Sequence, residues 1–200
     1  MPVRVSLEEV TRVARLASSH LSSIGNSLSH VRIPNHVLAD SQSDEYLVTE
    51  RVGADTGLGE HILPGSHKSV VDLPGIIDRM LKELLDWQDE DRSYLTGAFP
   101  GDLVMLVNNL GGLSGLELGA ITLEIARQLQ KTYKIEPVRI YSGTFMSSLN
   151  ELGFSISLLR VQELELAGGQ SMLNLLDAPS ETTGWPSPIS ASTWAKAGTK

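Results

Sequence analysis

The sequence contains no cysteine among its 200 residues. Disulfide bonds, thiolate metal sites and a cysteine nucleophile are therefore excluded. It also has no long apolar run that could cross a bilayer, and the first stretch, MPVRVSLEEVTRVARL, lacks the compact apolar core of a signal peptide. Because the lack of cysteine fits a reducing compartment, we expect the protein to reside in the cytosol.

Basic residues are also scarce, with 16 Lys and Arg against 24 Asp and Glu and a formal net charge of −8. Such a chain repels nucleic acid and anionic lipid, so neither nucleic acid nor a membrane is expected as a general partner. Local phosphate binding stays possible, because backbone amides can bind phosphate without basic side chains. Hydrophobic residues make up 41% of the chain, enough for one domain or large subdomain to bury a core.

Several catalytic signatures are missing as well. The chain has no Walker loop, no HExxH metal motif and no GxSxG nucleophile elbow. No cluster of Asp and Glu has the pattern of a magnesium site. The residues therefore give no metal site and no nucleotide motif that would indicate a kinase.

What is present is an alternation of helical and extended patterns. Ser6 followed by Glu9 predicts a capping box at the start of the first helix, and Gly25 is expected to end that unit. Apolar periodicity predicts helices at 6–21, 71–87 and 116–131, and strands at 45–52, 103–107, 138–141 and 154–161. The stretch 103–141 is typical of a βαβ unit. We therefore predict an α/β fold, a mixed β-sheet covered by helices.

The composition shifts at Ala178. Proline, serine and threonine then dominate, with little apolar content. Residues 178–200 are therefore predicted to be an interdomain linker or a disordered tail.

The segment VNNLGGLSG joins the apolar strand at 103–107 to the following helix. Gly111 and Gly112 allow close backbone approach, and Ser114 is placed to cap the helix. The start of a helix offers free amides and a positive dipole end, which suits a phosphate. The alternative is a tight strand-to-helix turn packed against its own sheet, since most such turns bind nothing.

His61 lies inside the glycine-rich segment GLGEHILPG. An imidazole in such a loop can face a cavity, titrate near neutral pH or act as a nucleophile. The alternative is an ordinary surface histidine.

Five segments in order resemble the dihydroxyacetone (glycerone) kinase family. They are LEEVTRVARLASSHLSSIGNSLSHVRIP (7–34), GLGEHILPG (57–65), LVMLVNNLGGLSGLELG (103–119), VRIYSGTFMSSLNELGFSISLLRV (138–161) and LLDAPSETTGWP (175–186). The second is similar to the family's active-site loop, G-x-G-I-H-x-E-x-G. Two positions depart from that pattern: Glu60 stands where the family has Ile, and Leu63 where it has Glu. A glutamate beside the imidazole favours the protonated, non-nucleophilic ring.

The resemblance implies one half of a two-part α/β substrate-binding domain. Residues 1–177 would be its second subdomain, and the first subdomain would lie elsewhere. The family role carries to His61 as the residue that binds dihydroxyacetone through a covalent hemiaminal, with Gly59, Gly111 and Gly112 as further substrate-binding residues. Phosphorylation to dihydroxyacetone phosphate, a step in glycerol and triose catabolism, would need ATP and magnesium from a separate nucleotide-binding domain or, as in some bacterial members, a phosphoprotein donor.

These implications leave more than one function open. The chain is expected to be part of an ATP-dependent glycerone kinase, a phosphotransferase, and inactive alone. The main alternative is a non-catalytic binding or regulatory module that kept the fold, and a weaker one is a small-ligand carrier. The residues do not distinguish dihydroxyacetone from glyceraldehyde as the substrate. A homodimer is also expected, because a missing half would expose apolar surface.

Overall fold

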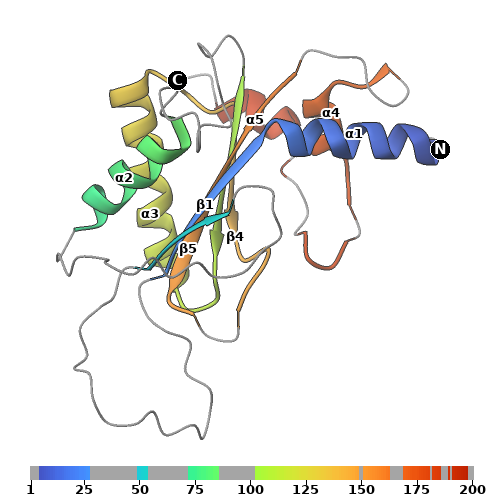
Figure 1. Cartoon of the computed structure of the whole chain (residues 1–200). Helices are drawn as coiled ribbons and strands as arrows, with labels where there is room; N and C mark the ends of the chain where they lie inside the picture. The colour runs from blue at the N-terminus through green and yellow to red at the C-terminus, as the bar shows by residue number, and fades with distance from the viewer. Residues whose placement is uncertain are drawn as a thin grey trace, which may run out of the picture.

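A computed structural model describes residues 5–27, 49–53, 72–85, 102–148, 151–162, 169–180, 182–185, 189 and 191–197. Its centre is a five-stranded sheet in the order β2-β1-β5-β3-β4 (Figure 1). The strands are β1 (Leu21–Ser27), β2 (Thr49–Gly53), β3 (Leu103–Asn109), β4 (Arg139–Gly143) and β5 (Gly153–Arg160). β3 and β4 are parallel and the other neighbours antiparallel, so the sheet is mixed, as predicted.

The predicted βαβ unit is confirmed. β3 leads into α3 (Gly115–Gln128), which continues as the π-helical turn η1 (Leu129–Tyr133) before β4. Val104 pairs with Arg139 and Asn108 with Gly143 in parallel register. Residues 103–107 of β3 are all apolar, because neighbouring strands flank β3 and both of its faces are covered.

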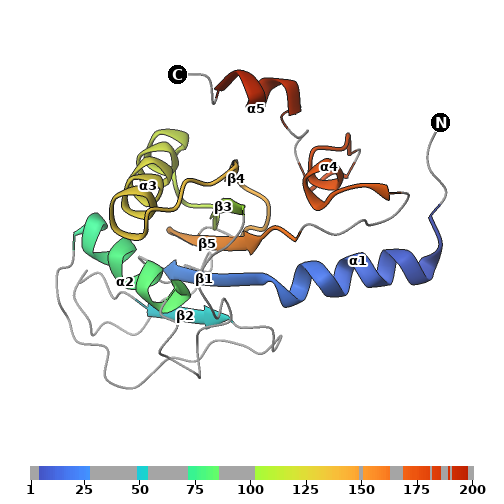
Figure 2. The same cartoon turned by 90° about the horizontal axis from the view of Figure 1, so that it is seen from above.

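The main core lies between one face of the sheet and two helices, α2 (Leu73–Leu85) and α3 (Figure 2). α2 buries a wide stripe of six apolar side chains, Ile76, Ile77, Met80, Leu81, Leu84 and Leu85. Alternate strand residues such as Met105, Phe154 and Ile156 meet this stripe from the sheet. Burial of apolar surface at about 25 cal/mol per Å² makes this layer the main source of stability.

A smaller core covers the opposite face. Val104, Tyr141 and Leu159 pack there against the short helix α4 (Met172–Leu176). Val13 and Leu16 of α1 (Leu7–Ser19) reach the edge of this cluster. The two cores follow directly from the period-2 alternation of side chains along each strand.

The first helix corresponds to the prediction, but the position of Gly25 does not. Ser6 caps α1 by accepting a hydrogen bond from the Glu9 amide at 3.2 Å, while the Glu9 carboxylate binds Arg12. The chain then continues from His20 directly into β1, so the expectation that Gly25 ends a unit is wrong. Gly25 lies inside β1 between Arg51 and Ser155, where cross-strand hydrogen bonds override its weak strand preference.

The predicted tail contains ordered contacts. Within 178–200 the structure describes α5 (Ala191–Ala197), and the rings of Trp185 and Trp194 lie 5.4 and 6.2 Å from that of Tyr141. Trp185 also stacks near Phe145 at 5.0 Å. The rings of Trp185 and Trp194 thus pack near Tyr141 of the smaller core, where large aromatic side chains bury much apolar surface.

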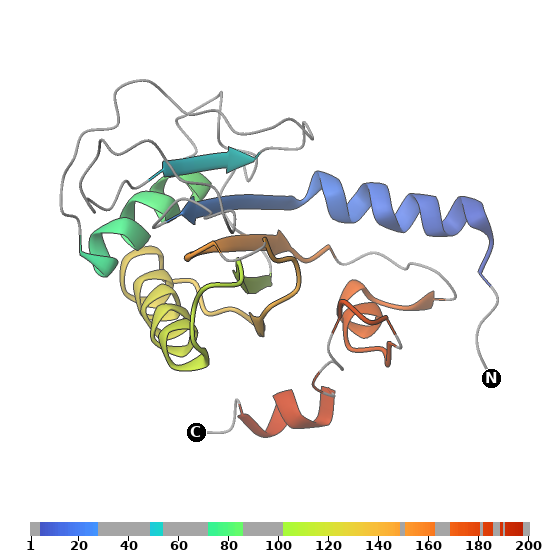
Figure 3. The ribbon, with the colours of Figure 1, turned by 90° about the horizontal axis from the view of Figure 1, so that it is seen from below.

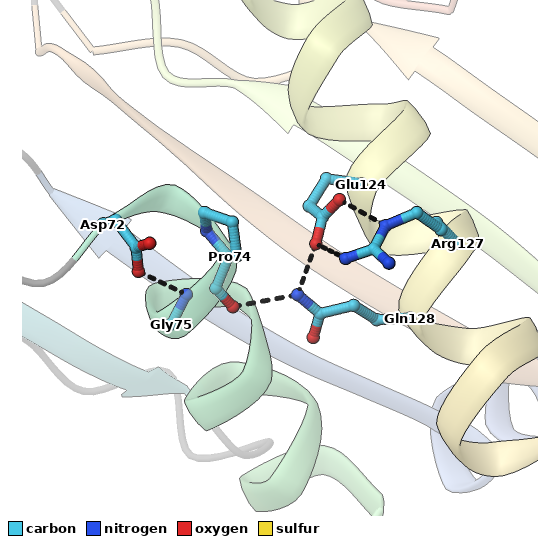
Figure 4. Close-up of polar contacts among 6 residues, drawn as sticks. All are labelled: Asp72, Pro74, Gly75, Glu124, Arg127 and Gln128. Atoms are coloured by element: carbon cyan, nitrogen blue, oxygen red, sulfur yellow. Dashed lines mark hydrogen bonds and ion pairs between the residues drawn. The ribbon is translucent and has the colours of Figure 1, made fainter.

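A polar network joins the start of α2 to the last turn of α3 (Figure 4). The Gln128 side-chain amide donates to the Pro74 carbonyl at 2.8 Å and to the Glu124 carboxylate at 2.7 Å. Arg127 donates two further hydrogen bonds to Glu124, at 2.6 and 2.7 Å. These bonds, with those of Gln128, lower the pKa of Glu124 to about 2.

Candidate functional site

The predicted loop at Gly111 and Gly112 lies at the carboxyl end of β3, beside the connection from β4 to β5. The Leu110 amide donates to the Gly153 carbonyl at 3.0 Å, and the Ser148 amide donates to the Leu110 carbonyl at 2.8 Å. Gly111 forms an isolated parallel bridge with Glu151. Two loops from different parts of the chain therefore form one surface at this end of the sheet.

Asn109 fixes the shape of the β3–α3 loop. Its side-chain oxygen accepts hydrogen bonds from the amides of Gly111 at 2.8 Å and Leu113 at 3.2 Å, and its side-chain amide donates to the Leu113 carbonyl at 2.8 Å. The side chain is buried at the end of an apolar strand. One asparagine thus satisfies three backbone groups that the turn would otherwise leave unpaired.

Asn108 does the same for the neighbouring connection. Its side-chain oxygen accepts from the amides of Phe145 at 2.8 Å and Met146 at 3.0 Å, and its amide donates to the Met146 carbonyl at 2.7 Å. Because successive strand residues point to opposite faces, Asn108 and Asn109 hold one loop each. Sequence reasoning missed both, although two asparagines after a buried apolar run were a visible signal.

The glycines are needed for packing within the protein. A Cβ on Gly112 would lie 2.8 Å from the Glu151 carbonyl oxygen and 2.8 Å from the Leu152 backbone. Gly111 has φ +120°, a conformation that side-chain-bearing residues rarely adopt. The close approach expected at these glycines is therefore made to residues 147–152 of the same chain.

The amides of this loop are already used. Those of Gly111 and Leu113 donate to Asn109, that of Gly112 donates to the Glu151 carbonyl at 2.8 Å, and that of Ser114 donates to the Glu117 carboxylate at 2.8 Å. Ser114 and Glu117 form a complete capping box, so the predicted cap at Ser114 is confirmed. Hydrogen bonds from Ser114 lower the pKa of Glu117. A carboxylate on the helix start opposes a bound phosphate, which favours the tight-turn alternative.

Two further buried polar residues line this end of the sheet. Glu151 is 2% exposed, and Asn26 of β1 is 1% exposed. The side-chain oxygen of Asn26 has no hydrogen-bond partner among the residues that the structure describes. A Cβ on Gly153 would lie 2.5 Å from the Asn26 carbonyl oxygen, so the strands approach closely here. Neither residue was singled out from the sequence, since a lone polar residue in a short strand or a loop gives no clear signal.

The predicted residues His61 and Gly59, and the departures Glu60 and Leu63, lie outside the described residues. Gly53 pairs with Ser23 in the first half of β1, and Pro74 contacts the last turn of α3. Gly111 and Gly112 lie at the other end of the sheet, before the first turn of α3. Of the predicted site residues, the described part of the chain thus includes Gly111 and Gly112.

No metal or membrane feature emerges from the described ranges. Within them, no three His, Asp or Glu side chains are grouped to hold a metal ion. The helices found there are all too short or too polar to span a bilayer.

Comparison with known proteins gives consistent matches. The Dak1 domain family matches residues 3–184. The chain is 38% identical over 200 residues to a dihydroxyacetone kinase of Pichia angusta, covering 96% of this chain and 32% of that protein. It is 31% identical to the human triokinase/FMN cyclase, covering 94% of this chain and 30% of that protein. The chain therefore spans about a third of the length of these relatives.

Solved structures share the fold. A dihydroxyacetone kinase operon co-activator matches with a TM-score of 0.67 at 20% identity, over 92% of this chain and 51% of that one. The dihydroxyacetone kinase of C. freundii in complex with AMP-PNP and Mg²⁺ matches with a TM-score of 0.65 at 24% identity, over 92% of this chain and 30% of that one. At these identities the likeness establishes the α/β fold alone.

Proposed function

Because the chain belongs to the Dak1 domain family of dihydroxyacetone kinases, we propose that it is one half of the two-part substrate-binding domain of such a kinase and captures dihydroxyacetone on His61. The observation that carries this proposal is the family match over residues 3–184, which includes the segment GLGEHILPG. Residues 1–177 then form the second part of a two-part substrate domain, and 178–200 lead toward a further domain. The cytosol stays the expected compartment.

The proposed capture is an addition to the ketone. A neutral His61 ring nitrogen bonds to the carbonyl carbon, the C=O π bond breaks, and the proton lost from nitrogen ends on the carbonyl oxygen. No water leaves, so the adduct keeps the full mass of dihydroxyacetone. Only a carbonyl compound can react in this way, so glycerol is rejected by chemistry, and the fixed adduct positions a terminal hydroxyl for phosphoryl transfer.

Gly59, next to the departure at Glu60, supplies close backbone approach in this proposal. The contribution of Gly111 and Gly112 is narrower. Both are exposed while their amides are engaged internally. Their surface, held in shape by Asn109, would meet the ligand or the missing half of the domain.

The isolated chain is proposed to lack kinase activity. Phosphoryl transfer depends on positioned phosphates and a metal. The carboxylates in the described ranges do not form a magnesium site, and the amides of the β3–α3 loop are occupied. The chain covers 32% of the Pichia angusta kinase. ATP and magnesium therefore fit a separate nucleotide-binding domain.

A non-catalytic binding or regulatory module is the second candidate. Glu60 beside His61 favours the protonated imidazole, and Leu63 removes an acid from the family pattern. The fold matches a co-activator and a kinase with similar TM-scores, 0.67 and 0.65, so the fold does not separate the two.

Mass spectrometry of the intact chain after incubation with dihydroxyacetone tests the capture, with His61→Ala as control. The expected result is an adduct of one equivalent, with the full mass of dihydroxyacetone, on the wild type and none on His61→Ala. Borohydride treatment is the control for lysine imines, because it reduces and fixes an imine, which has lost water. An adduct that survives His61→Ala removes His61 from the site. A parallel coupled assay should detect no ADP release, and a robust ADP signal would overturn the proposed inactivity. Binding without an adduct would support the second candidate.

We also propose that the chain self-associates. The motivation is the exposed apolar surface on α1, where Leu7 and Val10 are among the exposed large hydrophobic side chains.

A further inference from the structure

The C-terminal helix α5 lies on the outside of the molecule, on the same side as α4 (Figure 3). It has seven residues, ASTWAKA, and Trp194 is its one large apolar side chain. Ser192, Thr193 and Lys196 are exposed, while Trp194 is half-buried. A helix this short does not persist in water by itself, because nucleation costs more than its few hydrogen bonds return. α5 therefore depends on the contact that Trp194 makes with the body of the protein.

Trp194 rests on two residues of the edge strand β4, Arg139 and Tyr141. Its ring lies edge-on at 6.2 Å from the ring of Tyr141, and its centre is 5.4 Å from the Arg139 guanidinium carbon. We call Arg139 and Tyr141 the β4 seat. The seat offers Trp194 an aromatic contact and a cation–π contact, which are both short-range attractions of modest strength.

The β4 seat keeps its shape without help from α5. Arg139 donates two hydrogen bonds to the carboxylate of Asp177, at 3.0 and 2.7 Å. The Tyr141 ring packs 5.4 Å from that of Trp185, and the Trp185 backbone amide donates to the Thr182 carbonyl at 3.0 Å. Removal of α5 would therefore leave the seat standing, with the chain anchored as far as Trp185.

Two polar groups at this contact have no hydrogen bond. The Tyr141 hydroxyl and the Trp194 ring nitrogen Nε1 are buried, and neither has a partner in the part of the chain that the structure describes. Both are donors that water would satisfy if they were exposed. Leaving a buried donor unpaired costs about as much as an aromatic pair or a cation–π contact gains. The attraction and the penalty at the seat are therefore of similar size.

We propose that α5 is a reversible latch, closed when Trp194 lies on the β4 seat and open when α5 unwinds into solvent. Because the opposing terms nearly balance, the open state holds roughly a tenth to a half of the molecules. The chain bends between Trp185 and α5, where the sequence PSPIS contains two prolines that do not extend a helix. Opening brings water to both unpaired donors.

The latch controls access to one part of the surface. When it is closed, the Trp194 ring covers the Arg139 guanidinium and the Tyr141 ring. When it is open, a cation and a phenol at the edge of the sheet are free to meet another group. The ion pair between Arg139 and Asp177 stays closed in both states. This inference does not depend on the capture of dihydroxyacetone at His61.

Lys196 lies within α5 and makes the latch measurable by trypsin, which cuts after lysine only where the chain is unwound. Cleavage of a segment that opens and closes quickly follows the population of its open form. Loss of residues 197–200 is read from the intact mass at short times, which distinguishes this cut from cuts elsewhere in the chain. A free peptide of residues 189–200 gives the cleavage rate of a fully open segment.

The wild-type chain should be cut about two- to tenfold more slowly than the peptide, because most molecules are closed. Trp194→Ala removes the anchor, so this variant should be cut as fast as a peptide with the same substitution. Wild-type cleavage at the rate of the peptide would mean that α5 is not docked, and it would overturn the proposal. Cleavage as slow as global unfolding in urea would overturn it too, because α5 would then be a fixed part of the fold.

Tyr141→Phe gives the sharper test. It keeps the ring and removes one of the two unpaired donors, so the latch should close more tightly and cleavage should slow at least about threefold. Tyr133→Phe is the matched control, because it removes a hydroxyl from a tyrosine that packs against the main core. This control should leave the cleavage rate unchanged. Unchanged or faster cleavage in Tyr141→Phe, or equal slowing in both variants, contradicts the latch.

Discussion

Arg139 of β4 and Asp177, which follows α4, form a two-pronged ion pair. The Arg139 Nε and Nη2 atoms donate to the two Asp177 carboxylate oxygens at 3.0 and 2.7 Å. Their side chains are 14% and 7% exposed. The guanidinium also lies 5.4 Å from the centre of the Trp194 ring. The pair thus joins the edge strand, the short helix α4 and the C-terminal segment.

Breaking this pair should destabilise the protein markedly. Asp177→Asn leaves a nearly buried guanidinium without its counter-charge, at an expected cost of about 2–4 kcal/mol in the free energy of unfolding. Asp78→Asn is the matched control, because its partner Lys82 lies on the surface, where water and salt screen the pair and its contribution to stability is small. Urea titration followed by tryptophan fluorescence compares the two, and equal losses would contradict the role of Arg139–Asp177.

Gly112 and Gly119 should respond to alanine in opposite directions. At Gly112 the new Cβ meets backbone at 2.8 Å, so Gly112→Ala should cost about 1–3 kcal/mol. At Gly119 the Cβ meets nothing within 4 Å in a helix interior, so Gly119→Ala should stabilise by up to about 1 kcal/mol. Thermal unfolding of both variants measures the signs, and a neutral Gly112→Ala would refute the close packing against residues 151 and 152.

The low pKa of Glu124 predicts a pH dependence of stability. Arg127 and Gln128 lower this pKa from 4.5 to about 2, so folding favours the ionised carboxylate. A depressed pKa contributes stability that is complete above the ordinary value and disappears as the pH falls toward 2. The stability difference between wild type and Glu124→Gln should therefore be largest near neutral pH and shrink below about pH 4.5. Urea titrations at several pH values measure this difference, and a difference that does not change with pH would contradict the prediction.

Asn108→Asp should loosen the connection between β4 and β5. The carboxylate keeps the hydrogen bonds from the Phe145 and Met146 amides. Its second oxygen takes the place of the Asn108 Nδ2 atom, which lies 2.7 Å from the Met146 carbonyl oxygen. Two acceptors at that distance repel, and the loss of a buried bond costs about 1–3 kcal/mol. Hydrogen exchange should report faster exchange at the Met146 and Ser148 amides, while that of Gly111, held by Asn109, should change little.

Elements with a local sequence pattern were predictable, whereas elements that depend on contacts between distant residues were not. The unit from β3 to β4 was predictable, because an unbroken apolar strand, a capped helix and a second strand each have local signatures. β1 was missed, because LSSIGNS mixes small polar residues with one glycine and one isoleucine. Its strand state comes from pairing with β5 and β2, which lie far away in sequence.

In the candidate site, too, the local feature was predictable and the long-range contacts were not. Ser114 was predictable as a helix cap because the capping box is local. The roles of Asn108 and Asn109 depend on loops that meet only in the fold, so residue type alone did not reveal them. The packing of Trp185 and Trp194 against Tyr141 is likewise a long-range contact, which a composition rich in Pro, Ser and Thr conceals.

The passage from α1 into β1 has a mechanical consequence. The helix ends at Ser19 and the strand begins at Leu21, so His20 alone joins them. The His20 carbonyl accepts a hydrogen bond from the Arg160 amide at 3.0 Å, and its amide donates to the Ala17 carbonyl at 3.2 Å. Because hydrogen bonds hold both the amide and the carbonyl of His20, α1 is joined firmly to the central strands. The direction of the helix is therefore set by the pairing of β1 with β5, and tilting α1 against the sheet would break the hydrogen bond between His20 and Arg160.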